Sequence, residues 1–138
     1  MDCVSLGRMV EEKLFYFMKK LKTWEDAPWP EENIVHQNSQ FIVFKDGFPV
    51  TEGHLLFVPT TREHVNIVQC FGAAINWGEK GVSNGDFEGY NVGFNNGETA
   101  GQTVFWPHVH LIPRRKGDVE DPRGGVRHVI PRKGNYKV

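Results

Sequence analysis

The fold of this chain is decided by the stretch Gly101-Gln-Thr-Val-Phe-Trp-Pro-His-Val-His-Leu-Ile-Pro-Arg114. Its residues 103–112 are predicted to form a strand, in which successive side chains point to opposite faces. Trp106, His108 and His110 then share one face, while the other face is apolar and suits a core. The proline before His108 has no N–H to donate to a neighbouring strand, so it is expected at an edge, a bulge or the start of the strand. The sequence therefore predicts a strand that opens onto a site with two imidazoles.

Two histidines two residues apart fit three interpretations. They are structural histidines with satisfied hydrogen bonds, or they bind a metal with His54 as a further ligand. In the third interpretation, a neutral imidazole acts as nucleophile or general acid and base near pH 7. No Cys-x-x-Cys or His-Glu-x-x-His pattern supports the metal. Only the third interpretation explains why a glycine-rich loop, whose amides can face a phosphate, directly precedes the pair.

The composition is that of an ordinary globular protein with one domain. The chain has 138 residues, of which 39% are hydrophobic and 24% charged, and its formal net charge is −1. These values argue against a disordered chain and give no sign of a specific nucleic-acid partner. Two cysteines, Cys3 and Cys70, predict free thiols in a reducing compartment. Because the sequence shows neither a secretion signal nor about 18 consecutive apolar residues, we expect a cytoplasmic protein without a membrane segment.

Apolar periodicity predicts two helices, at about residues 6–22 and from Val65 to near Gly78. The Asp46-Gly47 pair predicts the turn of a hairpin. Together the elements predict an α+β fold with a mostly antiparallel sheet, in a single domain over residues 1–138 with a core at 33–114 and a C-terminal tail at 115–138. From Arg114 onward the sequence has eight Lys or Arg and three Asp or Glu, which either meet phosphates or are solvated, and solvation is the default expectation. The expected strands cover residues 33–37, 40–45, 54–58, 90–94 and 103–112.

Two blocks of the sequence resemble the histidine-triad (HIT) superfamily of nucleotidyl hydrolases and transferases. The first block reads Phe41-Ile-Val-Phe-Lys-Asp-Gly-Phe-Pro-Val-Thr-Glu-Gly-His-Leu-Leu-Phe-Val-Pro59 and is similar to the family's strand, Asp turn, Gly-His and second strand. The second block reads Asn91-Val-Gly-Phe-Asn-Asn-Gly-Glu-Thr-Ala-Gly-Gln-Thr-Val104 and continues through the two histidines to Pro113-Arg114, similar to the family's phosphate loop and triad strand. The tail at 117–131 is similar to that of bacterial members described as dinucleoside polyphosphate hydrolases.

The resemblance implies a role for each histidine of the motif. His108 falls on the residue that attacks the α-phosphorus and forms a nucleotidyl-histidine. His110 would contact the phosphates, and His54 falls on the histidine of the family's Gly-His pair. The first triad histidine is replaced by Trp106, which is a departure from the family pattern.

The resemblance also implies contacts to the nucleotide. Asp46 matches the residue that holds the ribose hydroxyls, although the carboxylate of an Asp-Gly turn is equally suited to bind its own backbone. Phe44 and Phe41 match the wall of the base pocket, and at least one of them is expected to be ordinary core. The positions that match phosphate contacts are Asn95, Gly101, Gln102 and Thr103.

The implied function is a homodimeric hydrolase that cleaves a purine nucleotide or a dinucleoside polyphosphate at the α-phosphate, without cofactor or metal. Only Cys3 remains of the cysteine pair that binds zinc in some bacterial relatives. The alternative is a noncatalytic nucleotide-binding or interaction module, because Trp106 cannot copy an imidazole that both donates and accepts. Loss of the first histidine is expected to slow the chemistry without abolishing nucleotide binding.

Overall fold

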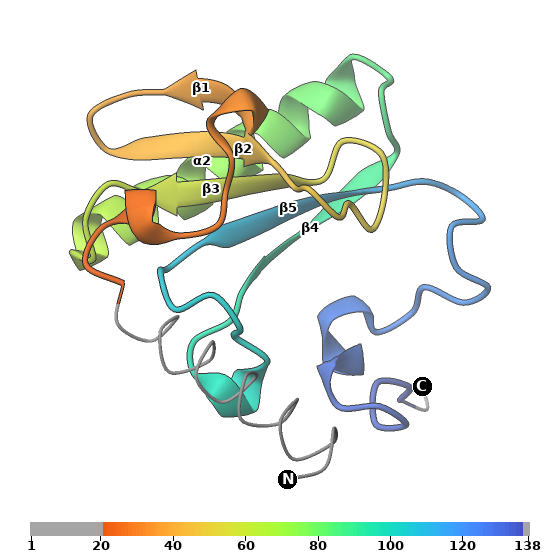
Figure 1. The fold of residues 1–138 in the computed structure, drawn as a ribbon. Coiled ribbons are helices and arrows are strands. Elements are labelled where there is room, and N and C mark those ends of the chain that lie inside the picture. Colours follow the sequence, from red (N-terminus) through yellow and green to blue (C-terminus); the bar gives the residue numbers. More distant parts are fainter. Residues whose placement is uncertain (1–20, 137–138) are drawn as a thin grey trace, which may run out of the picture.

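The computed structural model describes residues 21–136, which form a five-stranded antiparallel sheet with one long helix (Figure 1). The strand order is β1-β2-β3-β5-β4, so β1 and β4 are the edges of the sheet. The helix α2 spans His64–Ser83 and lies across the back of the sheet in Figure 1. This architecture confirms the predicted α+β class, while the helix predicted at 6–22 lies almost wholly outside the described residues. The strands are β1 (Ile34–Gln37), β2 (Phe41–Lys45), β3 (Leu55–Pro59), β4 (Gly89–Phe94) and β5 (Val109–Arg114), and the short 3-10 turns are η1 (Trp24–Asp26), η2 (Glu31–Asn33), η3 (Glu98–Ala100) and η4 (Gly125–Val129).

Both faces of the sheet are packed, because alternate side chains of its central strands are apolar on both sides. Val43 and Phe57 are fully buried on the face that α2 covers. Phe44 and Leu56 lie on the opposite face, where they pack with Trp106 and the segment that precedes β1. This second face carries the site, because the cross-strand partner of Leu56 on β5 is His110.

The predicted hairpin is confirmed, since β2 and β3 pair antiparallel from Phe41–Pro59 to Lys45–Leu55. The strand predicted at 103–112 is wrong in its first half, because β5 begins only at Val109. Pro107 has no N–H, and the carbonyl of Trp106 accepts a hydrogen bond from the side chain of His108. Residues 103–108 therefore leave the ladder and follow an irregular path.

The helix α2 is longer than predicted, continuing past Gly78 to Ser83. Glycine is unfavourable inside a helix, which is why the sequence pattern predicts an earlier end. Gly78 and Gly81 are buried and lie so close to the rings of Tyr90 and Phe87 that a Cβ at either glycine would collide with a ring. Within residues 21–136, no helix combines the length and the apolar character needed to cross a bilayer.

Candidate functional site

Three histidines and one aspartate meet where the central strands end. Asp46 directly follows β2, His54 directly precedes β3, and His108 and His110 flank the first residue of β5. The ring centroids of His108 and His110 are 5.1 Å apart, and those of His110 and His54 are 5.2 Å apart. The hairpin and the β3–β5 pairing thus assemble the histidines that the sequence predicts as a group.

The ring of His108 is held in one tautomer by the backbone. Its Nδ1 lies 2.8 Å from the carbonyl oxygen of Trp106, and a carbonyl can only accept, so Nδ1 carries the proton. Burial lowers the pKa of His108 and outweighs the opposing effects of this hydrogen bond and of the Asp46 charge. The neutral imidazole therefore has its free lone pair on Nε2, the condition that a nucleophile requires.

A chain of hydrogen bonds fixes the tautomers of the other two imidazoles, those of His54 and His110. The backbone N–H of Val50 donates to Nδ1 of His54 at 3.2 Å, so neutral His54 carries its proton on Nε2. This Nε2 lies 2.9 Å from Nδ1 of His110, which therefore accepts and keeps its own proton on Nε2. Burial, followed by the neighbouring His108 and His54, lowers the pKa of His110 to about 4. His108 and His110 are thus neutral rings of opposite tautomer, one with a lone pair on Nε2 and the other with a donor there.

Asp46 is shared between its own turn and the histidines. Its Oδ1 accepts a hydrogen bond of 2.7 Å from the backbone N–H of Phe48, which is the local bond that an Asp-Gly turn favours. Its Oδ2 lies 3.4 Å from Nε2 of His54. The side chain is half-buried, the local bond of the turn is formed, and the contact with the ribose stays a prediction.

The aromatic residues divide between the two faces of the sheet. Phe44 lies on the face of the site but is only 1% exposed beneath Trp24 and Trp29, and Phe41 packs on the face of α2, so both are core in this structure. Trp29 packs edge-on against His108, with ring centroids 5.0 Å apart, and also contacts Phe44. No motif surrounds Trp29 and its place depends on the fold of the segment before β1, so its contact with His108 could not be predicted from the sequence.

The loop between β4 and β5 is braced by its own side chain. Gln102 is buried, and its Oε1 accepts from the N–H of Gly97 while its Nε2 donates to the carbonyl of Val104. The side chain predicted to contact phosphate therefore holds the loop together. Gly101 adopts a φ of 90°, which favours glycine. Asn95 lies just beyond the β4–β5 pair and is half-buried, and Thr103 is exposed.

The HIT domain family model matches residues 30–117. The chain belongs to the HIT domain family. An uncharacterised HIT-like protein of Methanocaldococcus jannaschii is 33% identical over 103 residues, which cover 70% of this chain and 80% of that protein. Protein hit of Bacillus subtilis is 37% identical over 93 residues, covering 61% and 63% of the two chains. A solved structure described as a zinc-bound histidine triad family protein from Mycobacterium smegmatis superposes with a TM-score of 0.59 at 27% identity, covering 68% of this chain and 71% of that one.

This HIT protein uses Trp106 as a core residue. The Trp106 side chain is 3% exposed, its Nε1–H donates to the carbonyl of Pro59 at 2.9 Å, and the guanidinium of Arg62 lies over its ring. The carbonyl of the same residue fixes the tautomer of His108. The contact that orients His108 is therefore a backbone contact, which does not depend on the side chain at position 106.

One group of side chains in residues 21–136 of this HIT protein has the spacing of metal ligands. One ligand atom from each of Asp46, His54 and His110 lies within 4.8 Å of the others. Sequence reasoning considered His54 as a ligand but missed Asp46, which only the hairpin brings to the same place. Nε2 of His54 lies 2.9 Å from Nδ1 of His110 and 3.4 Å from Oδ2 of Asp46. The three side chains therefore satisfy one another's polar atoms without an ion. The absence of a metal stays a prediction.

Proposed function

We propose that this HIT protein hydrolyses a purine nucleotide at its α-phosphate, with Nε2 of His108 as the nucleophile. The observation that carries the proposal is the 2.8 Å hydrogen bond from Nδ1 of His108 to the carbonyl of Trp106. It directs the lone pair to Nε2, while burial keeps the ring neutral.

The neighbouring groups suit the charge that develops on the phosphate. The proton on Nε2 of His110 can hydrogen-bond to a phosphoryl oxygen, as can the amides of the loop at Gly101. Asp46, which directly follows β2, is the proposed contact of the ribose. These donors are fixed before the reaction, so they need little reorganisation in the transition state.

The proposed reaction has two balanced steps. In the first, the lone pair of His108 Nε2 forms a bond to phosphorus, the bond from phosphorus to the leaving group breaks, and the leaving group takes up a proton. In the second, water adds to phosphorus, the N–P bond breaks and its electron pair returns to Nε2, and the water releases one proton. The net reaction consumes one water and yields a nucleoside monophosphate.

The test is turnover of a panel of nucleoside phosphoramidates and dinucleoside polyphosphates. We expect His108→Ala to lower kcat by at least about a thousand-fold while nucleotide still binds. His64→Ala is the matched control, because His64 is an exposed histidine at the start of α2 and should leave kcat unchanged. A nucleotide-sized mass increase of the wild-type protein, denatured at alkaline pH because the P–N bond to histidine is acid-labile, would identify the intermediate. Binding without turnover by the wild type on the whole panel would instead support the noncatalytic module.

A homodimer and a cytoplasmic location are further parts of the proposal. Among residues 21–136 the outer edge of β4 pairs with no other strand, so its backbone groups are the proposed contact for a strand of a second copy. Light scattering should then give twice the chain mass of 15.8 kDa, and a monomer at working concentration would contradict the dimer.

A further inference from the structure

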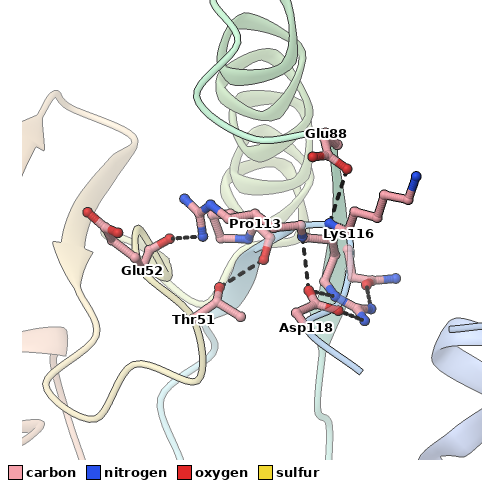
Figure 2. Close-up of polar contacts among 9 residues, drawn as sticks. Thr51, Glu52, Glu88, Pro113, Lys116 and Asp118 are labelled. Carbon is pink, nitrogen blue, oxygen red and sulfur yellow. Dashed lines mark hydrogen bonds and ion pairs between the residues drawn. The ribbon is translucent and has the colours of Figure 1, made fainter. Parts of the chain in front are cut away.

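One side chain of the β2–β3 loop reaches across to β5. The hydroxyl of Thr51 donates to the carbonyl of Pro113 at 2.8 Å, a contact between residues 62 positions apart that Figure 2 shows. Pro113 is fully buried and Thr51 is half-buried. Thr51 lies three residues before His54, so this bond anchors the loop that carries one of the site histidines.

The bond forms where the pairing of β3 with β5 stops. The two strands pair no further than Leu55, and Gly53 has a φ of 89°, a conformation outside the strand region that favours glycine. By the register of the two strands, Gly53 would face Pro113 if the ladder continued. The loop turns away instead, and the Thr51 hydroxyl supplies a donor for the buried carbonyl of Pro113.

The next residue of the loop is held as well. Nη1 of Arg115 donates to the carbonyl of Glu52 at 3.0 Å, as Figure 2 also shows. Asp118 accepts from the backbone N–H of Arg115 at 3.0 Å and pairs with the guanidinium of Arg114 at 2.8 Å. Arg114 and Arg115, basic residues that the sequence left open as phosphate contacts, thus hold the chain after β5 and the loop together.

The anchored loop carries the donor that decides the tautomer of His54. The backbone N–H of His54 donates to the carbonyl of Thr51 at 3.2 Å, and the N–H of Val50 donates to Nδ1 of His54 at 3.2 Å. Val50 directly precedes Thr51, so a shift of Thr51 moves the Val50 donor relative to the ring. The proton that this donor keeps on Nε2 of His54 is donated in turn to Nδ1 of His110, over 2.9 Å.

A second arrangement of these protons is chemically possible. If Nδ1 of His54 carried the proton, its Nε2 would accept from Nδ1 of His110, and Nε2 of His110 would have a lone pair in place of a donor. The N–H of Val50 excludes this arrangement, because two N–H groups cannot donate to each other. Oδ2 of Asp46, 3.4 Å from Nε2 of His54, favours the same tautomer from a longer distance. The donor at Nε2 of His110 thus depends on where the loop holds Val50.

We propose that Thr51 is a positioning residue for the reaction: by fixing the β2–β3 loop on β5, its hydroxyl keeps the proton of His110 on Nε2. The inference rests on the proposed function, in which that N–H donates to a phosphoryl oxygen as negative charge develops. Thr51 acts through Val50 and His54. Without its hydroxyl the Val50 N–H loses its fixed direction, so His110 becomes a mixture of both tautomers and the fraction that offers a donor falls.

Kinetics of two substitutions in the full-length protein test the hydroxyl. Thr51→Val keeps the shape of the side chain but removes the donor, so kcat on the best substrate of the panel should fall at least about 10-fold. AMP affinity should change by no more than about three-fold, because a donor to phosphoryl oxygens counts most in the transition state. Thr51→Ser keeps the hydroxyl and should stay within about three-fold of the wild-type kcat. A wild-type kcat in Thr51→Val, or a Thr51→Ser protein as slow as Thr51→Val, would overturn the inference.

Thr60→Val is the matched control. Thr60 lies at the other end of the same two strands, where its hydroxyl donates to the carbonyl of Ser39 at 2.8 Å. Both valine variants lose a hydrogen bond from a threonine to a carbonyl, so both should lower the urea midpoint of unfolding. Only Thr51→Val should lower kcat. An equal fall of kcat in both variants would assign the effect to a general loss of stability and would refute the role of Thr51.

NMR of the free protein tests the position of the proton itself. At about pH 7.5 the neutral imidazole predominates, and long-range proton–nitrogen correlations distinguish its two tautomers. The signals of His110 are those that are absent from His110→Asn. The wild type, Thr51→Ser and Thr60→Val should carry the proton of His110 on Nε2, whereas Thr51→Val should also show the Nδ1 form or a shift averaged between the two. A pure Nε2 form in Thr51→Val would contradict the inference.

The inference and the proposed function can fail separately. If His108→Ala retains turnover, the proposed nucleophile is wrong, and the NMR result still decides whether Thr51 sets the tautomer. If turnover requires His108 but Thr51→Val changes neither kcat nor the tautomer, only the inference about Thr51 is wrong. If Thr51→Val loses AMP affinity while His110 keeps its proton on Nε2, Thr51 contacts the nucleotide directly, which also refutes the inference. If the wild type does not turn over, the NMR result alone decides it.

Discussion

At the scale of single residues, Trp106 shows how a side chain can change while its backbone keeps a role. The carbonyl of Trp106 orients His108, and its indole fills the core and donates to Pro59. The tryptophan at position 106 is the feature of the sequence that argues against an enzyme. In the structure its side chain belongs to the core. A histidine at position 106 would leave part of this packed volume empty, so its main effect should be on stability.

The variant Trp106→Phe separates the role of the indole from the role of the backbone carbonyl. It keeps most of the buried ring but removes the N–H, which leaves the Pro59 carbonyl without its donor and should lower the free energy of unfolding by about 1–3 kcal/mol. The rate of turnover should stay within about three-fold, because the carbonyl at position 106 is retained. Urea unfolding and kcat measure the two effects. A ten-fold fall in kcat at unchanged stability would place the indole in the chemistry instead.

At the scale of elements, α2 contains two glycines near its end. Aromatic rings of the following segment occupy the space that larger side chains would need at these positions. Gly81 faces Phe87 and Gly78 faces Tyr90, whose hydroxyl donates to Glu79 on the same helix. This close contact sets how the chain leaves α2 and enters β4. Since β4 pairs with β5, which carries His110, the glycines help to position the strand beside the site.

Gly81→Ala should destabilise the protein although alanine is the better helix former. Alanine gains up to about 1 kcal/mol of helix propensity, but its Cβ would collide with the Phe87 ring, and overpacking of this kind costs about 1–3 kcal/mol. In a Phe87→Ala background the collision is gone, so the same substitution should be neutral or stabilising. Urea unfolding of the four proteins of this cycle gives the coupling. An equal loss in both backgrounds would show that the ring is not the cause.

At the scale of the whole molecule, the buried histidines make stability depend on pH. Burial lowers the pKa values of His54, His108 and His110, the last to about 4. Between pH 6.5 and 4 the unfolded chain binds more protons than the folded one, so the free energy of unfolding should fall as the pH is lowered through this range. His110 alone contributes at most about 1.4 kcal/mol per pH unit.

Urea unfolding at a series of pH values checks this dependence. His110→Asn removes one depressed pKa, so its stability should decline less steeply than that of the wild type between pH 6.5 and 4. Below pH 4 both proteins should lose further stability together, because the pKa of Asp118 is also held below its ordinary value and its ion pair is lost on protonation. A wild-type stability that is flat from pH 7 to 4 would contradict the buried, neutral state of the histidines.

The sequence by itself determined the α+β class, the β2–β3 hairpin and the candidate histidines with Asp46. These features depend on short-range properties, namely the two-residue alternation of strands, the chemistry of an Asp-Gly turn and motif spacing. Only the tertiary structure decided that Trp106 is core, that Gln102 braces its own loop, that Trp29 packs on His108 and that the Thr51 hydroxyl bonds to β5. Each of these depends on competition between distant partners for one hydrogen bond or one packed volume, and local sequence patterns do not specify which partner prevails.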